Sequence, residues 1–174
     1  MTRRVGATFG VIRFSLTELA ARAAAAQTPG PRRAPGSHAA AEAIAARAVF
    51  EARAADELEY FAPVAALPGF PKALARTTYE LRLGQVVPNR LEAAGEAGAD
   101  LTRLLARISE QRVRAGVDDR AALFVQASRA WSAGHVRWAG LPVVLLDVTI
   151  DSRAERDFIA AIAAAAPEVL ATVP

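Results

Sequence analysis

The segment from Leu141 to Ser152 constrains the fold more than any other stretch of the sequence. Between Val143 and Val148 it holds five apolar residues, many of them β-branched, and Asp147 alone interrupts them. Continuous apolar runs of this kind are typical of parallel strands buried on both faces. The segment therefore predicts a central strand with Asp147 at its carboxyl end, where open α/β sheets bind ligands. Two roles fit this Asp: a hydrogen bond that closes the strand, or a contact to Mg²⁺ between phosphates.

A helix and a second strand follow directly. Asp151 and Ser152 are residue types that cap helices, and an Ala-rich helix is expected from about Arg153 to Ala166. Residues 167–173 then return to apolar and β-branched types, which predicts a short strand. The C-terminal part of the chain thus reads as a strand-helix-strand unit.

A second junction of strand and helix is predicted near the N-terminus. Residues 8–14 read as a strand, and Ser15 with Glu18 has the spacing of a capping box before a helix over 16–26. The exposed amides at such a helix start can hold a phosphate, although ordinary capping explains the same residues. The residues that would make the phosphate contact are Arg13, Ser15 and Thr17.

The middle of the chain has helical patterns throughout. Residues 27–37 are rich in Pro, Gly and Arg and predict a loop or linker. Helices are expected over 38–59, from Pro71 onward, over 100–115, and after Asp119 as far as Trp131. Gly116 is expected to end the third of these helices, and Asp118-Asp119 to cap the fourth.

This order of elements predicts an α/β fold in which helices dominate. Strands are expected only near the two ends, at residues 8–14, 143–148 and 168–173. Because a strand and helix at the N-terminus need sheet partners, these three segments are predicted to lie parallel in one small sheet. Residues 38–134 would then form a helical lobe to one side.

One predicted helix carries a dense set of basic side chains, namely Lys72, Arg76 and Arg82. A solvated helix face is one interpretation, and a nucleic-acid contact is the other. The net charge of +3, from 20 Arg and one Lys among other charges, is compatible with a polyanionic partner without requiring one.

Composition excludes several classes of chemistry. The chain has no Cys and two His, His38 and His135, which lie far apart in the sequence, so we expect no metal site and no cofactor. We find no export signal after Thr2-Arg3-Arg4 and no apolar stretch of about 18 residues. A cytoplasmic location is therefore expected.

Three segments together resemble a known family. They are residues 67–82, LPGFPKALARTTYELR, residues 119–124, DRAALF, and the Leu-Leu-Asp that ends at Asp147. In this order they resemble the N-terminal helicase-like region of AddB-type proteins. These are the PD-(D/E)XK nuclease subunits of bacterial double-strand-break repair complexes, and they are related to UvrD-like superfamily 1 helicases. The likeness spans nearly the whole chain.

The resemblance implies a fold and a division into domains. Residues 1–30 and 139–174 would form part of a P-loop-NTPase/helicase-like α/β core, and residues 38–138 would be its inserted 1B-like helical domain. It also places the junction from Phe14 to Thr17 where such helicases contact single-stranded DNA. The implied partners are single-stranded or duplex-end DNA and an AddA-like helicase-nuclease subunit.

The same resemblance implies that this chain does not hydrolyse ATP. The Mg-binding strand of the helicases ends in Asp-Glu-Phe/Tyr-Gln-Asp-Thr/Ser, of which Asp147, Asp151 and Ser152 remain, while Val148 and Ile150 replace the Glu and the Gln. The sequence has no G-x-x-x-x-G-K-[ST] loop and no nuclease signature. We therefore expect a degenerate, non-catalytic, DNA-binding portion of a larger repair exodeoxyribonuclease, and no catalytic residue is assigned. The alternative is a helical scaffold module without DNA contact.

Overall fold

The structure is a computed structural model that describes residues 10–27 and 34–172. Over these residues the chain forms seven helices and four short strands. They are α1 (Leu16–Gln27), β1 (Ala34–Pro35), α2 (His38–Ala54), α3 (Phe70–Leu83), α4 (Pro88–Glu92), α5 (Glu96–Ala115), β2 (Val117–Asp118), α6 (Arg120–Ser132), β3 (Val143–Leu145), α7 (Arg153–Ala165) and β4 (Val169–Ala171). Helices dominate and all strand pairs are parallel, which confirms the predicted class at this level.

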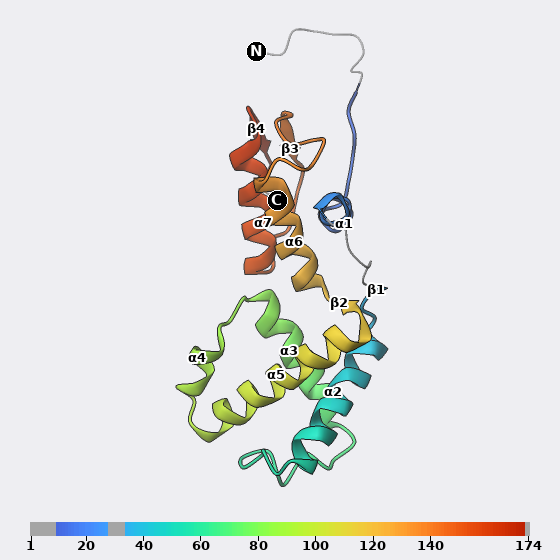
Figure 1. Ribbon diagram of the computed structural model, residues 1–174. Coiled ribbons are helices and arrows are strands. Elements are labelled where there is room, and N and C mark those ends of the chain that lie inside the picture. The colour runs from blue at the N-terminus through green and yellow to red at the C-terminus, as the bar shows by residue number, and fades with distance from the viewer. Residues whose placement is uncertain (1–9, 28–33, 173–174) are drawn as a thin grey trace.

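The helices pack into two lobes placed end to end (Figure 1). The terminal lobe contains α1, α6, α7, β3 and β4, and its core is centred on Phe124, Trp131 and Phe158. The rings of Phe124 and Trp131 each lie 5.9 Å from the ring of Phe158. The middle lobe contains α2 to α5, and Leu104 and Ile108 of α5 are buried in its core. Each lobe therefore has a separate apolar core.

The packing divides the chain at a different place from the predicted domain boundary. The predicted helical insertion covers residues 38–138, a range that includes α6. In the structure α6 packs between α1 and α7, because Phe124 and Trp131 need the apolar face of α7 to leave water. The change from one core to the other therefore falls near Asp119.

The predicted N-terminal strand is absent from the described part of that segment. Residues 10–15 belong to no strand, and Val11 and Ile12 are 75% and 54% exposed. Thr8 and Phe9 lie outside the described residues. The prediction that this segment joins one three-stranded sheet is therefore wrong for residues 10–14. Their β-favouring composition suits a pleated surface, but a strand needs a neighbour that pairs with its backbone, and β3 pairs with β4.

β3 and β4 pair in parallel across α7, as the strand-helix-strand prediction required. The prediction that β3 is a central strand buried on both faces is wrong. Val144 is 57% exposed and lies in register with Leu170, which is 63% exposed, while Val143 packs toward the core of the terminal lobe. Successive strand residues face opposite sides, so this two-stranded sheet has one face that is partly covered through β3 and one open face.

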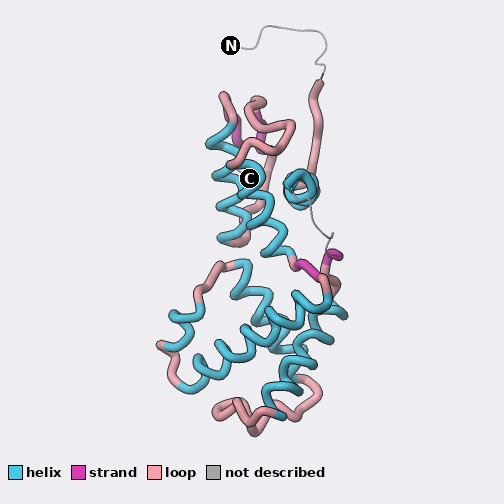
Figure 2. Tube along the Cα trace, viewed as in Figure 1, coloured by secondary structure: helices cyan, strands magenta, loops and turns pink. Residues whose placement is uncertain are grey.

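A second parallel pair joins the lobes where a linker was expected. β1 lies within the predicted linker over 27–37 and pairs with β2 (Figure 2). Gly116 ends α5 in the left-handed conformation, as predicted, and its carbonyl accepts the N–H of Ala34 at 2.8 Å. The chain after α1 is thereby fixed to the turn between α5 and α6.

α2 ends at Ala54, not at Glu59 as predicted, because a buried carboxylate stabilises a loop in place of the last helical turn. Asp100 on α5 is fully buried and accepts the N–H groups of Glu59 and Phe61, both at 3.0 Å. Arg103 donates to the other oxygen of Asp100 at 2.8 Å. These long-range contacts outweigh the helical propensity of the Ala-rich segment.

α4 and α5 approach each other closely at Gly98. A Cβ built on Gly98 would lie 1.7 Å from the carbonyl oxygen of Leu91, which is far inside van der Waals contact. Because the two helices lie so close together here, this buried position requires glycine.

We expect Gly98→Ala to destabilise the protein by about 1–3 kcal/mol, because relief of the clash must move backbone and outweighs the helix propensity of Ala. The free energy of unfolding in urea measures the effect. Gly69→Ala is the matched control, since a Cβ there meets no atom within 4 Å. Equal stabilities of the two variants would contradict the close approach.

Candidate nucleic-acid interface

The start of α1 is built as a capped helix that follows an extended segment. Ser15 Oγ accepts the N–H of Glu18 at 3.1 Å, and the Ser15 carbonyl accepts the N–H of Leu19 at 2.9 Å. Only this hydrogen bond of the predicted capping box forms, because the Glu18 carboxylate instead accepts a hydrogen bond from Arg22 at 2.9 Å. A guanidinium one turn away is a stronger donor than a backbone amide. The first N–H groups of α1 have no acceptor within the helix, so they remain available at the helix start.

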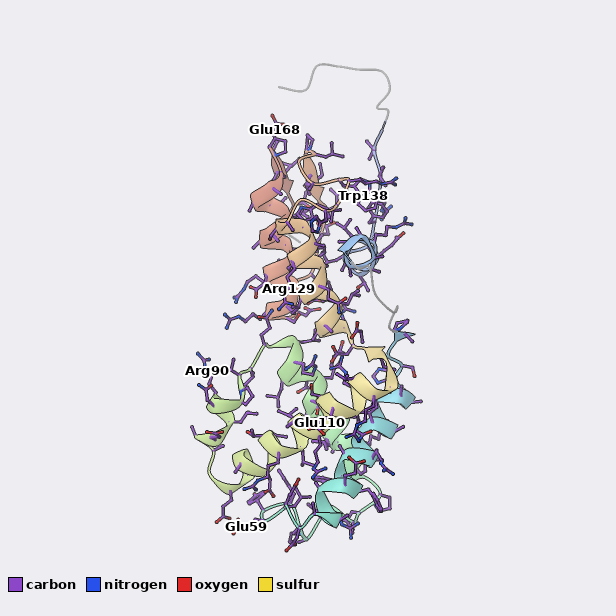
Figure 3. The ribbon with its side chains drawn as sticks, viewed as in Figure 1. Glu59, Arg90, Glu110, Arg129, Trp138 and Glu168 are labelled. Carbon is purple, nitrogen blue, oxygen red and sulfur yellow. The ribbon has the colours of Figure 1, made fainter. Side chains whose placement is uncertain are left out.

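An aromatic and arginine column lies beside this helix start. The ring of Phe14 lies 5.0 Å from the ring of Trp138, at an interplanar angle of 59°. The guanidinium of Arg22 lies 5.1 Å from the Phe14 ring, and that of Arg137 lies 4.6 Å from the Trp138 ring. We call these four residues the Phe14–Trp138 column. The column joins the N-terminal segment and α1 to the loop between α6 and β3, which is far from them in sequence. Trp138, on this loop, is labelled in Figure 3.

The column carries positive charge on a surface that water can reach. Arg137 of the column is exposed, as is Arg13, which precedes Phe14 in the chain; neither has a carboxylate partner among the described residues. Arg22 is paired with Glu18, so its charge is partly neutralised. Of the other predicted residues here, Ser15 is exposed and Thr17 is half-buried. The structure thus brings Arg13, Ser15 and Thr17 together at one helix start, next to two aromatic rings.

Such a surface suits a single nucleic-acid strand chemically. Guanidinium groups and helix-start amides bind phosphate oxygens, and aromatic faces stack with bases. The sequence analysis missed Trp138, Arg137 and Arg22 as members of this site. A signal for them existed, because Arg13-Phe14 and Arg137-Trp138 are two Arg-aromatic pairs in segments outside the helices.

The basic set predicted on α3 lies in the other lobe and does not form one face. Lys72 and Arg76 are exposed, and Arg76 pairs with Glu80 on the same helix at 3.2 Å. Arg82 points into the junction of the two lobes and donates to Asp119 at 2.6 Å. The structure therefore does not place these three residues with Arg13, and the charge of Arg82 is neutralised.

Asp119 forms an ionic clamp between three helices, which we call the Asp119 clamp. Its carboxylate lies 2.6 Å from Arg82 of α3 and 2.6 Å from Arg112 of α5, and it accepts the N–H of Ala122 at the start of α6, at 2.8 Å. The predicted helix cap at Asp119 is thus confirmed. Burial alone would raise the pKa of Asp119, but the hydrogen bonds from Arg82 and Ala122 and the two positive charges hold it below its usual value.

The three residues matched to the Mg-binding strand are not gathered at one point. Asp147 adopts φ 46° after β3, and its Oδ1 accepts the hydroxyl of Thr172 at 3.0 Å. Ser152 caps α7, as predicted, through the N–H of Glu155 at 3.3 Å. Asp151 donates its own N–H to Glu155 Oε2 at 3.1 Å. Within the described residues no group of three or more acidic or His side chains is arranged to hold a metal ion.

Asp151 and Ser152 instead line a cleft of about 460 Å³ between the lobes, together with Tyr79, Arg120 and Glu155. Arg120 donates to the buried Glu155 carboxylate at 2.7 Å. Burial would raise the pKa of Glu155, but the hydrogen bonds from Arg120, Ser152 and the Asp151 N–H lower it. The cleft is lined by three acidic side chains, Glu80, Asp151 and Glu155, and by two basic ones, Arg120 and Arg153, so it offers no positive surface for a polyanion.

No family model matches the chain, and no curated protein matches it in sequence. Among the helices of the described residues, none combines the length and the apolar character needed to cross a membrane.

We expect Asp119→Asn to lower the free energy of unfolding by about 1.5–3 kcal/mol, because Asn keeps the helix cap but leaves two guanidinium groups without their charged acceptor. A folded pKa below the usual value of about 3.9 means that this contribution is complete above that pH and is lost as pH falls through the lowered pKa. Urea unfolding at about pH 7 and about pH 3 should therefore show a difference between variant and wild type that shrinks in acid.

The matched control is Asp157→Asn, which removes an exposed carboxylate 3.9 Å from Arg153. Exposed pairs contribute about 0–1 kcal/mol, so this variant should remain close to wild type. A loss in Asp119→Asn no larger than in the control would contradict the clamp.

Proposed function

We propose that this chain is a non-catalytic, helicase-like, DNA-binding portion of a bacterial PD-(D/E)XK repair nuclease of the AddB type. The observation that carries the DNA contact is the Phe14–Trp138 column, with its aromatic rings and guanidinium groups at the start of α1. Its position coincides with the junction that the resemblance assigns to single-stranded DNA. The DNA would be a single strand or the opened end of a duplex.

Charge and geometry support a contact with the DNA backbone at this lobe. Arg13 and Arg137 are exposed cations, and α1 offers its positive end next to them. Each phosphate contact releases counterions, so binding through these groups depends steeply on salt. Few such cations are available here, so the affinity is micromolar or weaker and tolerant of sequence.

The proposal assigns no catalysis to this chain. Val148 stands where a helicase has the Glu that orients water, and the sequence lacks the phosphate-binding loop. Asp147 in addition has its carboxylate engaged with Thr172. Cleavage of DNA would belong to a nuclease domain of the parent protein, and an AddA-like subunit in the cytoplasm would be the partner.

A second candidate function is a scaffold module that contacts protein and not DNA. The open face of the β3–β4 sheet favours it, since Val144, Leu146 and Leu170 are all more than half exposed. Parallel sheets are normally covered on both faces, so the open face of this sheet suits a partner protein that would cover it. DNA binding distinguishes the two candidates.

The test is fluorescence anisotropy of a labelled single strand at two salt concentrations. We expect wild type to bind at low salt, and the double variant Arg13→Ala/Arg137→Ala to bind with a log–log salt slope smaller by about 1.4, the value for two lost phosphate contacts.

The comparison variant is Lys72→Ala/Arg76→Ala, which removes the same charge from the middle lobe. A larger loss in the Arg13/Arg137 variant supports the terminal lobe as the interface. A larger loss in the Lys72/Arg76 variant moves the interface to α3, and absence of binding by wild type at low salt favours the scaffold.

A further inference from the structure

Trp138 is held in place by the loop on which it lies. The loop between α6 and β3 is anchored by Val136, which is 3% exposed in the core of the terminal lobe. The Ala139 N–H donates to the Val136 carbonyl at 2.9 Å, and the Leu141 N–H donates to the Trp138 carbonyl at 3.2 Å. The indole itself packs partly against the same core and contacts Phe14. Trp138 is therefore a pre-positioned ring at the surface.

The side chain that lies over the Trp138 ring is the solvent-exposed Arg137. Arg137 places its guanidinium 4.6 Å from the ring centroid and has no acidic partner among the described residues. Cation–π contacts at exposed sites are weaker than the stacking of a nucleobase on an aromatic ring. A base can therefore replace the guanidinium on the ring, and the released cation stays within one residue of the bound strand.

We propose that Trp138 is a stacking platform for one unpaired nucleobase, and that Arg137 moves from the ring to the neighbouring phosphate when the base binds. This inference rests on the proposed function, because it concerns the same interface and the same strand. Bases inside a duplex expose no ring face, so the platform selects unpaired nucleotides. Every base has an aromatic face, so the platform has little sequence preference.

The decisive comparison uses wild-type protein with two labelled strands of equal length and charge, oligothymidylate and an abasic strand. Stacking of one base corresponds to about 5- to 150-fold in affinity, so we expect the abasic strand to bind more weakly by a factor in this range. Equal binding of the two strands overturns the platform and leaves phosphate binding in place. Binding of neither strand overturns both the platform and the proposed function.

Variants assign the effect to the ring. Trp138→Leu should lower the affinity for oligothymidylate about tenfold while binding of the abasic strand stays unchanged, and Trp138→Phe should recover most of the loss. Tryptophan fluorescence gives an independent readout, because Trp131 is 3% exposed and Trp138 is half-buried. Oligothymidylate should quench wild type and leave Trp138→Phe unquenched; equal quenching of both proteins would overturn the assignment to Trp138.

Discussion

The carboxylate of Asp119 binds Arg82 from α3 and Arg112 from α5 and accepts the N–H of Ala122 at the start of α6, at the point where one apolar core gives way to the other. Arg112 is 9% exposed, and burial lowers its pKa against the opposing effect of Asp119. An unpaired guanidinium at such a depth would be costly, so the clamp is a condition for bringing the helices together. The relative position of the lobes depends on it.

The arrangement of the lobes determines which arginine side chains are neutralised by a carboxylate and which stay exposed to solvent. α3 and α5 bring Arg82 and Arg112 into the junction, where one aspartate neutralises them. In the terminal lobe, Arg13 and Arg137 remain without acidic partners in the described residues, and Arg137 lies over the ring of Trp138. A dense set of basic residues on α3 was predicted to contact nucleic acid, yet Arg137, an exposed cation over an aromatic ring, lies in the other lobe.

Strand β3 shows what a run of apolar residues predicts and what it does not. The run from Val143 to Val148 predicted a parallel strand, and β3 is one. The same run predicted burial on both faces, and Val144 and Leu146 are instead exposed. A continuous apolar run indicates that both faces suit an apolar environment, but it does not supply the second layer that would cover them. Likewise residues 10–14 have β-favouring side chains and no strand partner.

The sequence by itself determined the local structure wherever adjacent residues supply the interaction. Ser15, Asp119 and Ser152 start helices and Gly116 ends one, because caps and left-handed turns depend on residues within a few positions. The tertiary structure decided the rest. Four features join residues that are distant in the chain: the packing of α6 in the terminal lobe, the β1–β2 pair, the ionic clamp and the tilted ring contact of Phe14 with Trp138. Such contacts depend on which apolar faces pack against each other. Helical periodicity in the sequence predicts which residues share an apolar face, but it does not predict the element that packs on that face.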